Sequence, residues 1–331
     1  MIPDVRRTIE QTTPDGRPRW RLAGAGGWLL TVPLAAAAGA RVTHLDESSS
    51  LLLLASGLTP LLWLPALVAF GIGLRARRPA LTLLSGGVAA LYLTWALPGL
   101  GVPEATASGS ARLRLFSANL RIRNPDGASI TAEIGAARPD VVILQELGPG
   151  MVDQLRRSGA LDPYPYALAR PRSGAFGIGI WSRLPLAEAS EVEVEGATML
   201  RVTLMVSGRR VPLWAVHTVA PIGPNRDRWR RQLAWLSRVA RQDRPLIVAG
   251  DLNATRWHRG LGKLLADGLD DAHERRGRGW AATWPRDRWP LPPVMRLDHV
   301  LVSPEIGVLA VREGVGAGSD HRPIVADLVM R

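Results

Sequence analysis

Three apolar stretches without a charged side chain constrain this sequence more than any other feature. They cover residues 22–40, 51–74 and 80–103. Each is close to or above the roughly 20 residues that a helix needs to cross a bilayer core of about 30 Å. Helices buried in a soluble core normally keep a polar face, and these stretches have none. The pattern therefore predicts a bundle of three transmembrane helices. The apolar signal of the first is weaker than that of the other two, because glycines and Pro33 interrupt it.

The arginines predict how these helices are oriented. The tail at residues 1–21 holds five arginines and the second loop holds three, whereas the first loop has one arginine against Asp46 and Glu47. Basic loops stay on the cytoplasmic side. We therefore expect a multi-pass protein of the plasma membrane with a cytoplasmic N-terminus and everything after residue 103 outside. Residues 35–40 also resemble the end of a signal peptide, and cleavage there would leave the remainder on the same side.

The rest of the chain has the composition of a soluble domain, predicted at 112–331 after a linker at 104–111. Residues 110–331 contain 32 basic and 23 acidic side chains, so that 32 − 23 gives a net charge of +9. The chain contains no cysteine. Disulfides, thiolate metal sites and a cysteine nucleophile are therefore excluded.

Short apolar runs rich in β-branched residues separate stretches with helical periodicity in this domain. The expected strands are 113–119, 141–146, 176–181, 199–206, 211–217, 245–250, 299–302 and 323–329. The expected helices are 129–137, 151–158, 227–241 and 259–266. This irregular alternation of strands and helices predicts an α/β layered domain.

Polar side chains stand at the ends of the predicted strands. They are Asn119, Glu146, His217, Asp251, Asn253, Asp298, Asp320 and His321. A single Asp or Asn after a strand is more often a turn residue. The ends of neighbouring strands, however, meet at a common rim of a sheet, so we expect these side chains to converge. Carboxylate and amide oxygens without thiolates suit Mg²⁺ or Mn²⁺. Such a cation, a carboxylate that orients water and imidazoles beside phosphoryl oxygens are what phosphoryl hydrolysis needs.

Six short motifs occur in an order that is typical of one family. They are Ser117-Ala118-Asn119-Leu120, Leu144-Gln145-Glu146-Leu147, Val216-His217-Thr218, Gly250-Asp251-Leu252-Asn253-Ala254, Arg296-Leu297-Asp298-His299-Val300 and Gly318-Ser319-Asp320-His321-Arg322-Pro323-Ile324. Together they resemble the endonuclease/exonuclease/phosphatase superfamily over the whole soluble domain. The resemblance implies a four-layer α/β/β/α sandwich and a phosphoesterase that depends on a divalent metal.

The resemblance also implies a metal site. Glu146 would be the main ligand of Mg²⁺ or Mn²⁺, with Asn119 and Asp320 close to the metal. Arginine binds phosphate oxygens well because its guanidinium is a planar fork of donors. Arg183 and Arg322 are therefore candidates to bind the substrate, although a solvated basic surface drawn to anionic lipid would place arginines in the same way.

The catalytic roles are likewise carried over from the resemblance. Asp251 would orient or deprotonate the attacking water, and Asn253 would hold the phosphate. His321 would contact the scissile phosphate with its tautomer fixed by Asp298, as a carboxylate partner does for imidazoles in general. His217 would contact the phosphate or donate a proton to the leaving group.

The substrate is not fixed by these motifs. An anchored site samples only a thin shell beside the bilayer, which favours a lipid-linked phosphate or diphosphate of the cell envelope. The layout of the whole chain also resembles the VanJ-type membrane proteins of teicoplanin and vancomycin resistance, which implies action on a lipid intermediate of the cell wall. The alternatives are a cell-surface nuclease, favoured by the net positive charge, and a catalytically inactive binding domain. No protein partner is predicted.

Overall fold

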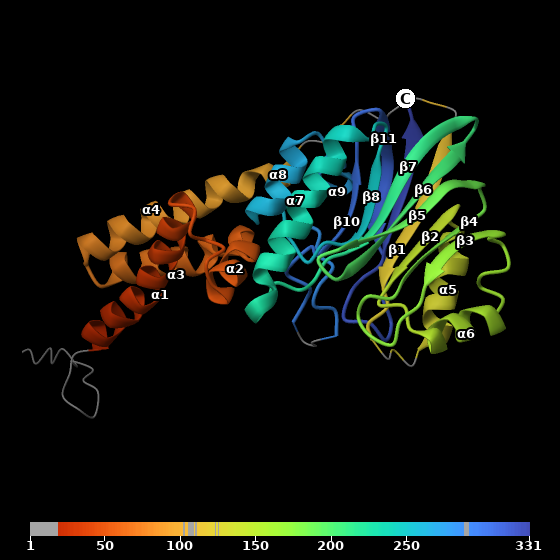
Figure 1. Cartoon of the computed structure of the whole chain (residues 1–331). Coiled ribbons are helices and arrows are strands. Elements are labelled where there is room, and N and C mark those ends of the chain that lie inside the picture. Colours follow the sequence, from red (N-terminus) through yellow and green to blue (C-terminus); the bar gives the residue numbers. More distant parts are fainter. Residues whose placement is uncertain are drawn as a thin grey trace, which may run out of the picture. The chain divides into compact units, whose positions relative to one another are not determined.

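The computed structural model describes residues 19–101, 103–104, 109, 111–122, 124, 126–287 and 291–331. Most of the tail predicted at 1–21 and most of the linker predicted at 104–111 lie outside the described residues. The chain divides into two compact units, Met1–Leu97 and Pro98–Arg331 (Figure 1). We refer to them as unit 1 and unit 2.

Unit 1 is helical. Its elements are α1 (Arg19–Val42), α2 (Ser50–Gly57), the short 3₁₀ helix η1 (Thr59–Leu61), α3 (Trp63–Arg75) and α4 (Pro79–Ala96), after which η2 (Leu97–Leu100) follows. Two helices, over Gly24–Val42 and Pro79–Leu100, are long and apolar enough to cross a membrane. They indicate association with a membrane. The number of crossings and the side on which unit 2 lies stay predictions.

The span predicted at residues 51–74 is helical but bent. Ser50–Gly57 and Thr59–Arg75 meet at an angle of 59°, so the described residues hold two spanning helices, or three if this bent pair is one span. The bend lies at Leu58, and Pro60 follows in the first turn of η1. Because proline has no N–H to donate and its ring clashes with the preceding turn, α2 cannot continue through it.

Unit 2 consists of two six-stranded sheets, whose strand orders are β11-β12-β1-β2-β4-β3 and β5-β6-β7-β8-β10-β9. The first sheet comprises β1 (Arg112–Asn119), β2 (Val141–Gln145), β3 (Tyr166–Arg170), β4 (Ile178–Ser182), β11 (Ile306–Glu313) and β12 (Ile324–Met330). The second sheet comprises β5 (Leu186–Val194), β6 (Ala197–Val206), β7 (Arg209–His217), β8 (Ile247–Asp251), β9 (Asp270–Asp271) and β10 (Asp298–Val302).

The two sheets pack against each other through one apolar core. Leu115 and Ile143 of the first sheet share this core with Val202, Leu213 and Ala249 of the second. All five side chains are fully buried. Side chains alternate between the faces of a strand, so the intervening residues of each sheet point away from the core. These outward faces are free to receive helices.

Helices cover both outward faces. The helices are α5 (Gly127–Ala137), α6 (Pro149–Arg157), α7 (Arg226–Gln242), α8 (Arg259–Ala266) and α9 (Ala272–Arg275), and η3 (Gly223–Asn225) precedes α7. Phe116 and Leu144 of the first sheet pack in one cluster with residues of α5 and α6. On the second sheet, Trp214 of β7 meets Trp235 of α7 edge to face, with ring centroids 4.9 Å apart. The predicted α/β architecture is confirmed.

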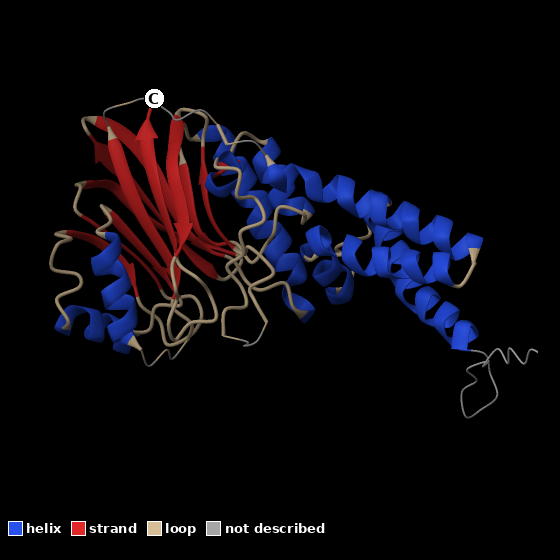
Figure 2. Ribbon diagram, turned by 180° about the vertical axis from the view of Figure 1, so that it is seen from behind, coloured by secondary structure: helices blue, strands red, loops and turns tan. Residues whose placement is uncertain are grey.

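Each sheet contains one parallel pair among antiparallel neighbours. These pairs are β1–β2 and β7–β8, connected through α5 and α7. We call the edge at which β1, β2, β7 and β8 end the carboxyl edge. The long loops of unit 2 gather at this edge (Figure 2). The crevice outside the carboxyl ends of parallel strands is where α/β folds usually bind ligands.

Candidate active site

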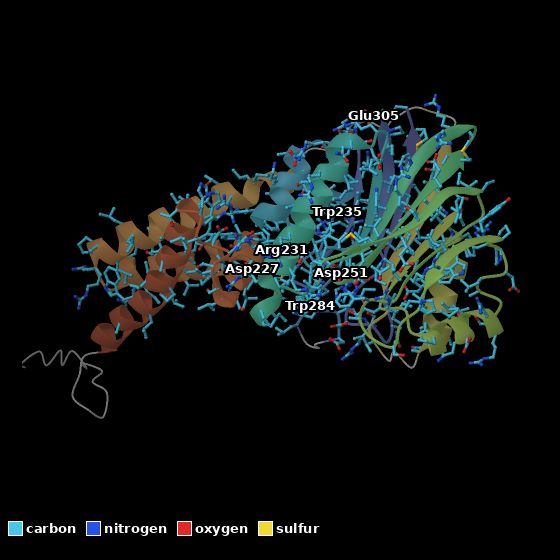
Figure 3. The ribbon with its side chains drawn as sticks, viewed as in Figure 1. Asp227, Arg231, Trp235, Asp251, Trp284 and Glu305 are labelled. Atoms are coloured by element: carbon cyan, nitrogen blue, oxygen red, sulfur yellow. The ribbon has the colours of Figure 1, made fainter. Side chains whose placement is uncertain are left out.

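Most of the predicted site residues lie at the carboxyl edge. Asn119 ends β1, Glu146 directly follows β2, and His217 and Asp251 end β7 and β8 as register partners. Asp298 begins β10 and lies directly opposite Asp251 in the antiparallel ladder. The ends of five strands from both sheets thus supply the polar side chains. Figure 3 shows Asp251 near Trp284, at the same end of the strands.

Asn119 connects the two sheets at the site. Its amide Nδ2 donates to Glu146 Oε1 at 3.1 Å and to Asp251 Oδ2 at 3.0 Å. The second oxygen of Glu146 accepts the backbone N–H of Ile122 at 2.7 Å. A carboxylate from each sheet is therefore fixed by one amide, and both face the same space.

Unusual backbone conformations surround these side chains. Arg121, Glu146 and Asn253 have φ angles of 62°, 53° and 46°, in the left-handed region. Such residues are strained and cluster at functional sites. Gly250 is required for a different reason, because a Cβ there would lie 1.9 Å from the carbonyl oxygen of Val216. The Gly-Asp-Leu-Asn motif therefore lets β8 approach β7 and then turn sharply.

The turn after β8 fixes Asp251 and Asn253 together. The backbone N–H of Asn253 donates to Asp251 Oδ1 at 2.8 Å, and its side-chain Nδ2 donates to Thr218 O at 2.9 Å. Burial raises the pKa of Asp251, although His321 and His217 act in the opposite direction. The buried carboxyl thus has a greater tendency to hold a proton than an exposed one.

The tautomer of His217 follows from its neighbours. Its Nδ1 lies 2.9 Å from the carbonyl oxygen of Ala175, which can only accept, so Nδ1 carries the proton. Nε2 then faces Asp251 Oδ2 at 3.6 Å and Glu146 Oε1 at 3.9 Å. The ring of Phe176 packs beside it at 5.8 Å between centroids. His217 is therefore aimed at the space between the two carboxylates.

His321 lies between two carboxylates. Its Nδ1 is 2.8 Å from Asp298 Oδ2, and its Nε2 is 3.8 Å from Asp251 Oδ2. Burial by itself would lower the pKa of His321, but the charges of Asp298 and Asp251 outweigh it and raise the pKa to about 10. The imidazole is therefore positively charged at neutral pH.

The donor set fits a divalent cation. The carboxylates of Asp251 and Asp298 lie within 4.8 Å of each other and of the imidazole of His321, all three residues are buried, and His321 would ligate a cation only after losing a proton. Asp298 Oδ1 is buried without a hydrogen-bond partner in the described part of the chain. Glu146 and Asn119 add oxygens beside Asp251. Such oxygen-rich sites suit Mg²⁺ or Mn²⁺ better than softer metals.

Asp320 lies beside Trp284, in the segment that also carries His321. Its Oδ2 accepts a hydrogen bond from Trp284 Nε1 at 3.3 Å, and its carboxylate adds to the charge that raises the pKa of His321. The compact carboxylate–imidazole group contains Asp298 in its place. Asp320 therefore lies next to the site, on the side of Trp284.

The two candidate arginines are not brought to the site. Arg183 follows Ser182, which pairs with Val141 at the start of β2, so Arg183 lies at the edge opposite the carboxyl edge. Its guanidinium lies over the ring of Tyr164 at 5.4 Å. The placement of Arg183 in the site is wrong, because strand direction, which the sequence does not reveal, decides the edge.

Arg322 follows His321 but points elsewhere. Its side chain lines a pocket of about 430 Å³ together with Glu133 of α5 and Arg312 of β11. Its backbone N–H donates to Thr283 O at 2.9 Å. Successive residues of an extended segment point to opposite sides, so Arg322 faces the α5 side while His321 faces Asp298.

Several supporting residues escaped the sequence analysis. Ser319 Oγ donates to Asn119 O at 2.7 Å and accepts the N–H of His321 at 3.0 Å, which ties β1 to the loop before β12. Thr283 Oγ1 accepts the N–H of Asp298 at 3.3 Å. Ser319 belongs to a recognised motif, but no motif contains Thr283, so only the fold reveals its contact.

A second buried pair supports the turn after β8. His299 is fully buried, with Nδ1 2.6 Å from Asp271 Oδ2 and Nε2 2.8 Å from the carbonyl oxygen of Ala254. Each ring nitrogen therefore faces an oxygen, one from a carboxylate and one from the backbone. Ala254 directly follows Asn253, and His299 thus holds the far end of the turn. Asp271 lies 28 positions away in the sequence, and no pattern pairs the two.

Comparison with known proteins identifies relatives of this unit. The sequence profile of the Endonuclease/Exonuclease/phosphatase family matches residues 116–321. Among curated proteins, none matches the chain in sequence. The fold is similar to that of TDP2 from D. rerio in complex with a single-strand DNA product, with a TM-score of 0.57, 21% identity, 66% of this chain covered and 99% of that chain.

Two bacterial structures are similar as well. An endonuclease/exonuclease/phosphatase from Beutenbergia cavernae is 23% identical with a TM-score of 0.53, and the match covers 67% of this chain and 72% of that chain. The 3′ phosphatase NExo from Neisseria, bound to a product DNA hairpin, is 18% identical with a TM-score of 0.53, over 65% of this chain and 98% of that chain. These likenesses show the fold.

Proposed function

Because the chain belongs to the endonuclease/exonuclease/phosphatase family, we propose that it is a phosphoesterase that depends on Mg²⁺ or Mn²⁺ and acts on a lipid-linked phosphate or diphosphate. The observation that carries the hydrolytic part is the convergence of Glu146, Asn119 and Asp251 with two imidazoles at the carboxyl edge. The four-layer α/β/β/α order belongs to the proposal, and the two packed sheets with helices on their outward faces support it.

The cation would be held by Glu146, with Asn119 and Asp251 beside it. A bound divalent cation supplies positive charge that neutralises a phosphate and stabilises the charge developing in hydrolysis. Several carboxylates lie close together in this site. They are stable there only when a positive charge or a proton compensates their negative charges.

The remaining steps belong to the side chains of unit 2. Asp251 lies where a carboxylate can orient a water and accept its proton, and its raised pKa favours that acceptance. His321, charged and held through Nδ1 by Asp298, presents Nε2–H to a phosphoryl oxygen. His217 presents Nε2 from the other side and can exchange a proton with the leaving group. Asn253 would hold the phosphate through its amide.

The lipid-linked substrate is supported by the helices of unit 1. Two of them are long and apolar enough to cross a bilayer, and an anchored site meets phosphates at a membrane surface far more often than free solutes. The arginine-rich second loop supports a cytoplasmic position of that loop, and with one further crossing the active unit would lie outside the cytoplasm. A role in glycopeptide resistance and in cell-wall synthesis, as in VanJ-type proteins, is part of this proposal.

A nuclease is the second candidate. The structures of D. rerio TDP2 and Neisseria NExo contain product DNA, and residues 110–331 carry a net charge of +9, from 32 basic and 23 acidic side chains. Binding that neutralises several DNA phosphates loses affinity steeply with added salt. This candidate places the substrate in solution rather than in the membrane.

The test is phosphate release by the purified full chain from undecaprenyl diphosphate in detergent, with Mg²⁺, with EDTA and with the variant His321→Ala. Release that requires both the metal and His321 supports the lipid phosphatase. Cleavage of single-stranded DNA without release from the lipid supports the nuclease instead. Absence of both activities from a folded, metal-loaded chain would contradict the hydrolase itself.

A further inference from the structure

Exposed apolar side chains gather on the loops of the carboxyl edge. Ile122 is 41% exposed, Ile222 72%, Leu291 65% and Val315 61%. They lie on four separate loops, after β1, after β7, before β10 and before β12. Exposing one such residue is ordinary for a soluble domain. Four at one edge, each on a different loop, form a surface that a partner can cover.

Three of these residues lie on loops connected to the candidate active site. The backbone N–H of Ile122 donates to the carboxylate of Glu146. Ile222 follows His217 by five positions, and Val315 precedes His321 by six. Val315 is held on the α5 side, where it lines the same pocket as Arg322, because its N–H and that of Gly316 donate to Glu133 at 2.9 and 2.8 Å. The apolar tips therefore belong to the loops that carry or flank site residues.

The opposite edge of the sheets exposes fewer apolar side chains. Its turns carry polar residues at their tips, including Ser207, Asp243 and Glu305. Figure 3 shows Glu305 at the end of the strands away from Asp251. Among the described residues, Tyr166 is the one large apolar side chain exposed there. The carboxyl edge also carries a polar tip, Glu195 in the turn between β5 and β6, but the exposed apolar tips of four loops lie at this edge.

Arginines accompany the apolar tips. Arg121 precedes Ile122, and its side chain remains 50% exposed beside Asp287. Arg172 remains 42% exposed, and its backbone N–H donates to Leu147 O, next to Glu146. Apolar tips with neighbouring cations are the composition that binds the surface of an anionic bilayer, where the cations meet lipid phosphates.

We propose that the carboxyl edge docks on the bilayer, with Ile122, Ile222, Leu291 and Val315 entering the head-group region and Arg121 and Arg172 at the level of the lipid phosphates. A bilayer is the occupant because the same chain carries helices of spanning length. This inference deepens the proposed function and rests on it: docking brings a phosphate at the membrane surface to the site without extracting its lipid tail.

The absence of cysteine from the chain allows a direct test. Ile222→Cys and Val315→Cys are each labelled with an environment-sensitive fluorophore in the full-length protein, and Glu305→Cys at the opposite edge is the matched control. The proteins are reconstituted into phosphatidylglycerol vesicles containing a spin-labelled lipid quencher. Apolar tips of interfacial elements enter about 5–10 Å into the membrane, so we expect strong quenching at 222 and 315 and little at 305.

Equal quenching at all three positions, or none at 222 and 315, overturns the docking surface. Loss of quenching at 222 and 315 when single-stranded DNA is added, at constant salt, also overturns it in favour of nucleic acid. The readout does not depend on catalysis. Quenching without release of phosphate from the lipid therefore supports docking and rejects the proposed substrate. Release of phosphate without quenching at 222 and 315 supports the substrate and rejects docking.

A second measurement addresses the purpose of docking. The double variant Ile222→Asn, Val315→Asn should raise the KM for a diphosphate embedded in vesicles at least tenfold, and leave the hydrolysis of a small water-soluble phosphodiester unchanged. Equal loss on both substrates would indicate damage to the site and would reject a role in reaching the membrane.

Discussion

Asp251 and Asp298 lie directly opposite each other across the antiparallel pair of β8 and β10. Like charges in that arrangement repel each other, and both side chains are buried. His321 relieves the repulsion, because it is bonded to Asp298 through Nδ1 and turns Nε2 toward Asp251. The three groups form one electrostatic unit, in which each charge depends on the other two.

The first prediction concerns stability and pH. The pKa of His321 is raised from 6.5 to about 10, so its contribution to stability is fully present below pH 6.5 and is lost as the pH rises through 10. In EDTA, the Tm of the full chain should therefore fall between pH 7 and 10. The variant His321→Gln should be less stable at pH 7 and have a flatter profile. A wild-type Tm that rises over this range would contradict the charged imidazole.

The second prediction concerns the carboxylates in catalysis. Replacing a general base typically costs about 100- to 10,000-fold in rate, so Asp251→Asn should lower kcat by that range with intact folding. Asp298→Asn keeps the shape but no longer fixes the charged form of His321, and it should also lower kcat. Thermal unfolding of both variants serves as the control. Activity close to wild type in Asp251→Asn would remove this residue from the mechanism.

The third prediction concerns metal binding. Mg²⁺ or Mn²⁺ should raise the Tm of the chain, because a ligand at 100 times its Kd stabilises the folded state by about 2.7 kcal/mol. Glu146→Gln should abolish most of this rise and Asp320→Asn should reduce it less, since Asp320 lies beside Trp284. Titration calorimetry on the same variants checks the order. An equal loss in both would place Asp320 among the direct ligands.

The fourth prediction concerns the buried pair of Asp271 and His299. His299→Asn keeps a donor but is too short to contact Asp271 and Ala254 at once, as the ring does. Residues that orient ligands from behind typically contribute about 10- to 100-fold. We therefore expect kcat/KM to fall in this range, because Asp251 and Asn253, which is proposed to hold the phosphate, both shift. A change in KM alone would assign the pair to substrate binding.

The fifth prediction concerns Arg183. Its position at the opposite edge predicts that Arg183→Ala leaves kcat and KM unchanged within experimental error, and surface substitutions of this kind change stability by about 0.5 kcal/mol or less. Arg121→Ala, at the carboxyl edge, is the matched comparison and should weaken substrate binding. A loss of activity in Arg183→Ala comparable to that in Arg121→Ala would contradict the placement.

Most strands of unit 2 could be predicted because buried strands appear in the sequence as short, continuous apolar runs. Runs such as 141–145 and 247–251 are buried at every position. β5 was missed, because an edge strand with alternating glutamates exposes much of its length and lacks the apolar signal. β9 has two residues and exists through its pairing with β10. The bend before Pro60 is not visible in the apolar content of this stretch, because a proline that lacks a backbone N–H does not make the stretch more polar.

The sequence predicts which residues form the site better than it predicts their positions. The residue types at strand ends identified the set that meets at the carboxyl edge, with Asp320 beside His321 and Trp284. The predicted positions of the two arginines were wrong for different reasons. The edge on which Arg183 lies depends on strand order. The side to which Arg322 points depends on the packing of α5. The contact of His299 with Asp271 arises from two distant segments that only the second sheet brings together.

The position of β12 has a consequence for biosynthesis. This strand lies inside the first sheet, between β11 and β1, although β1 is made more than 200 residues earlier. The first sheet therefore cannot close, and His321 cannot reach Asp298, until residue 330 has left the ribosome. A chain still being synthesised therefore holds an incomplete site, and the proposed activity can begin only once the last strand has joined the sheet.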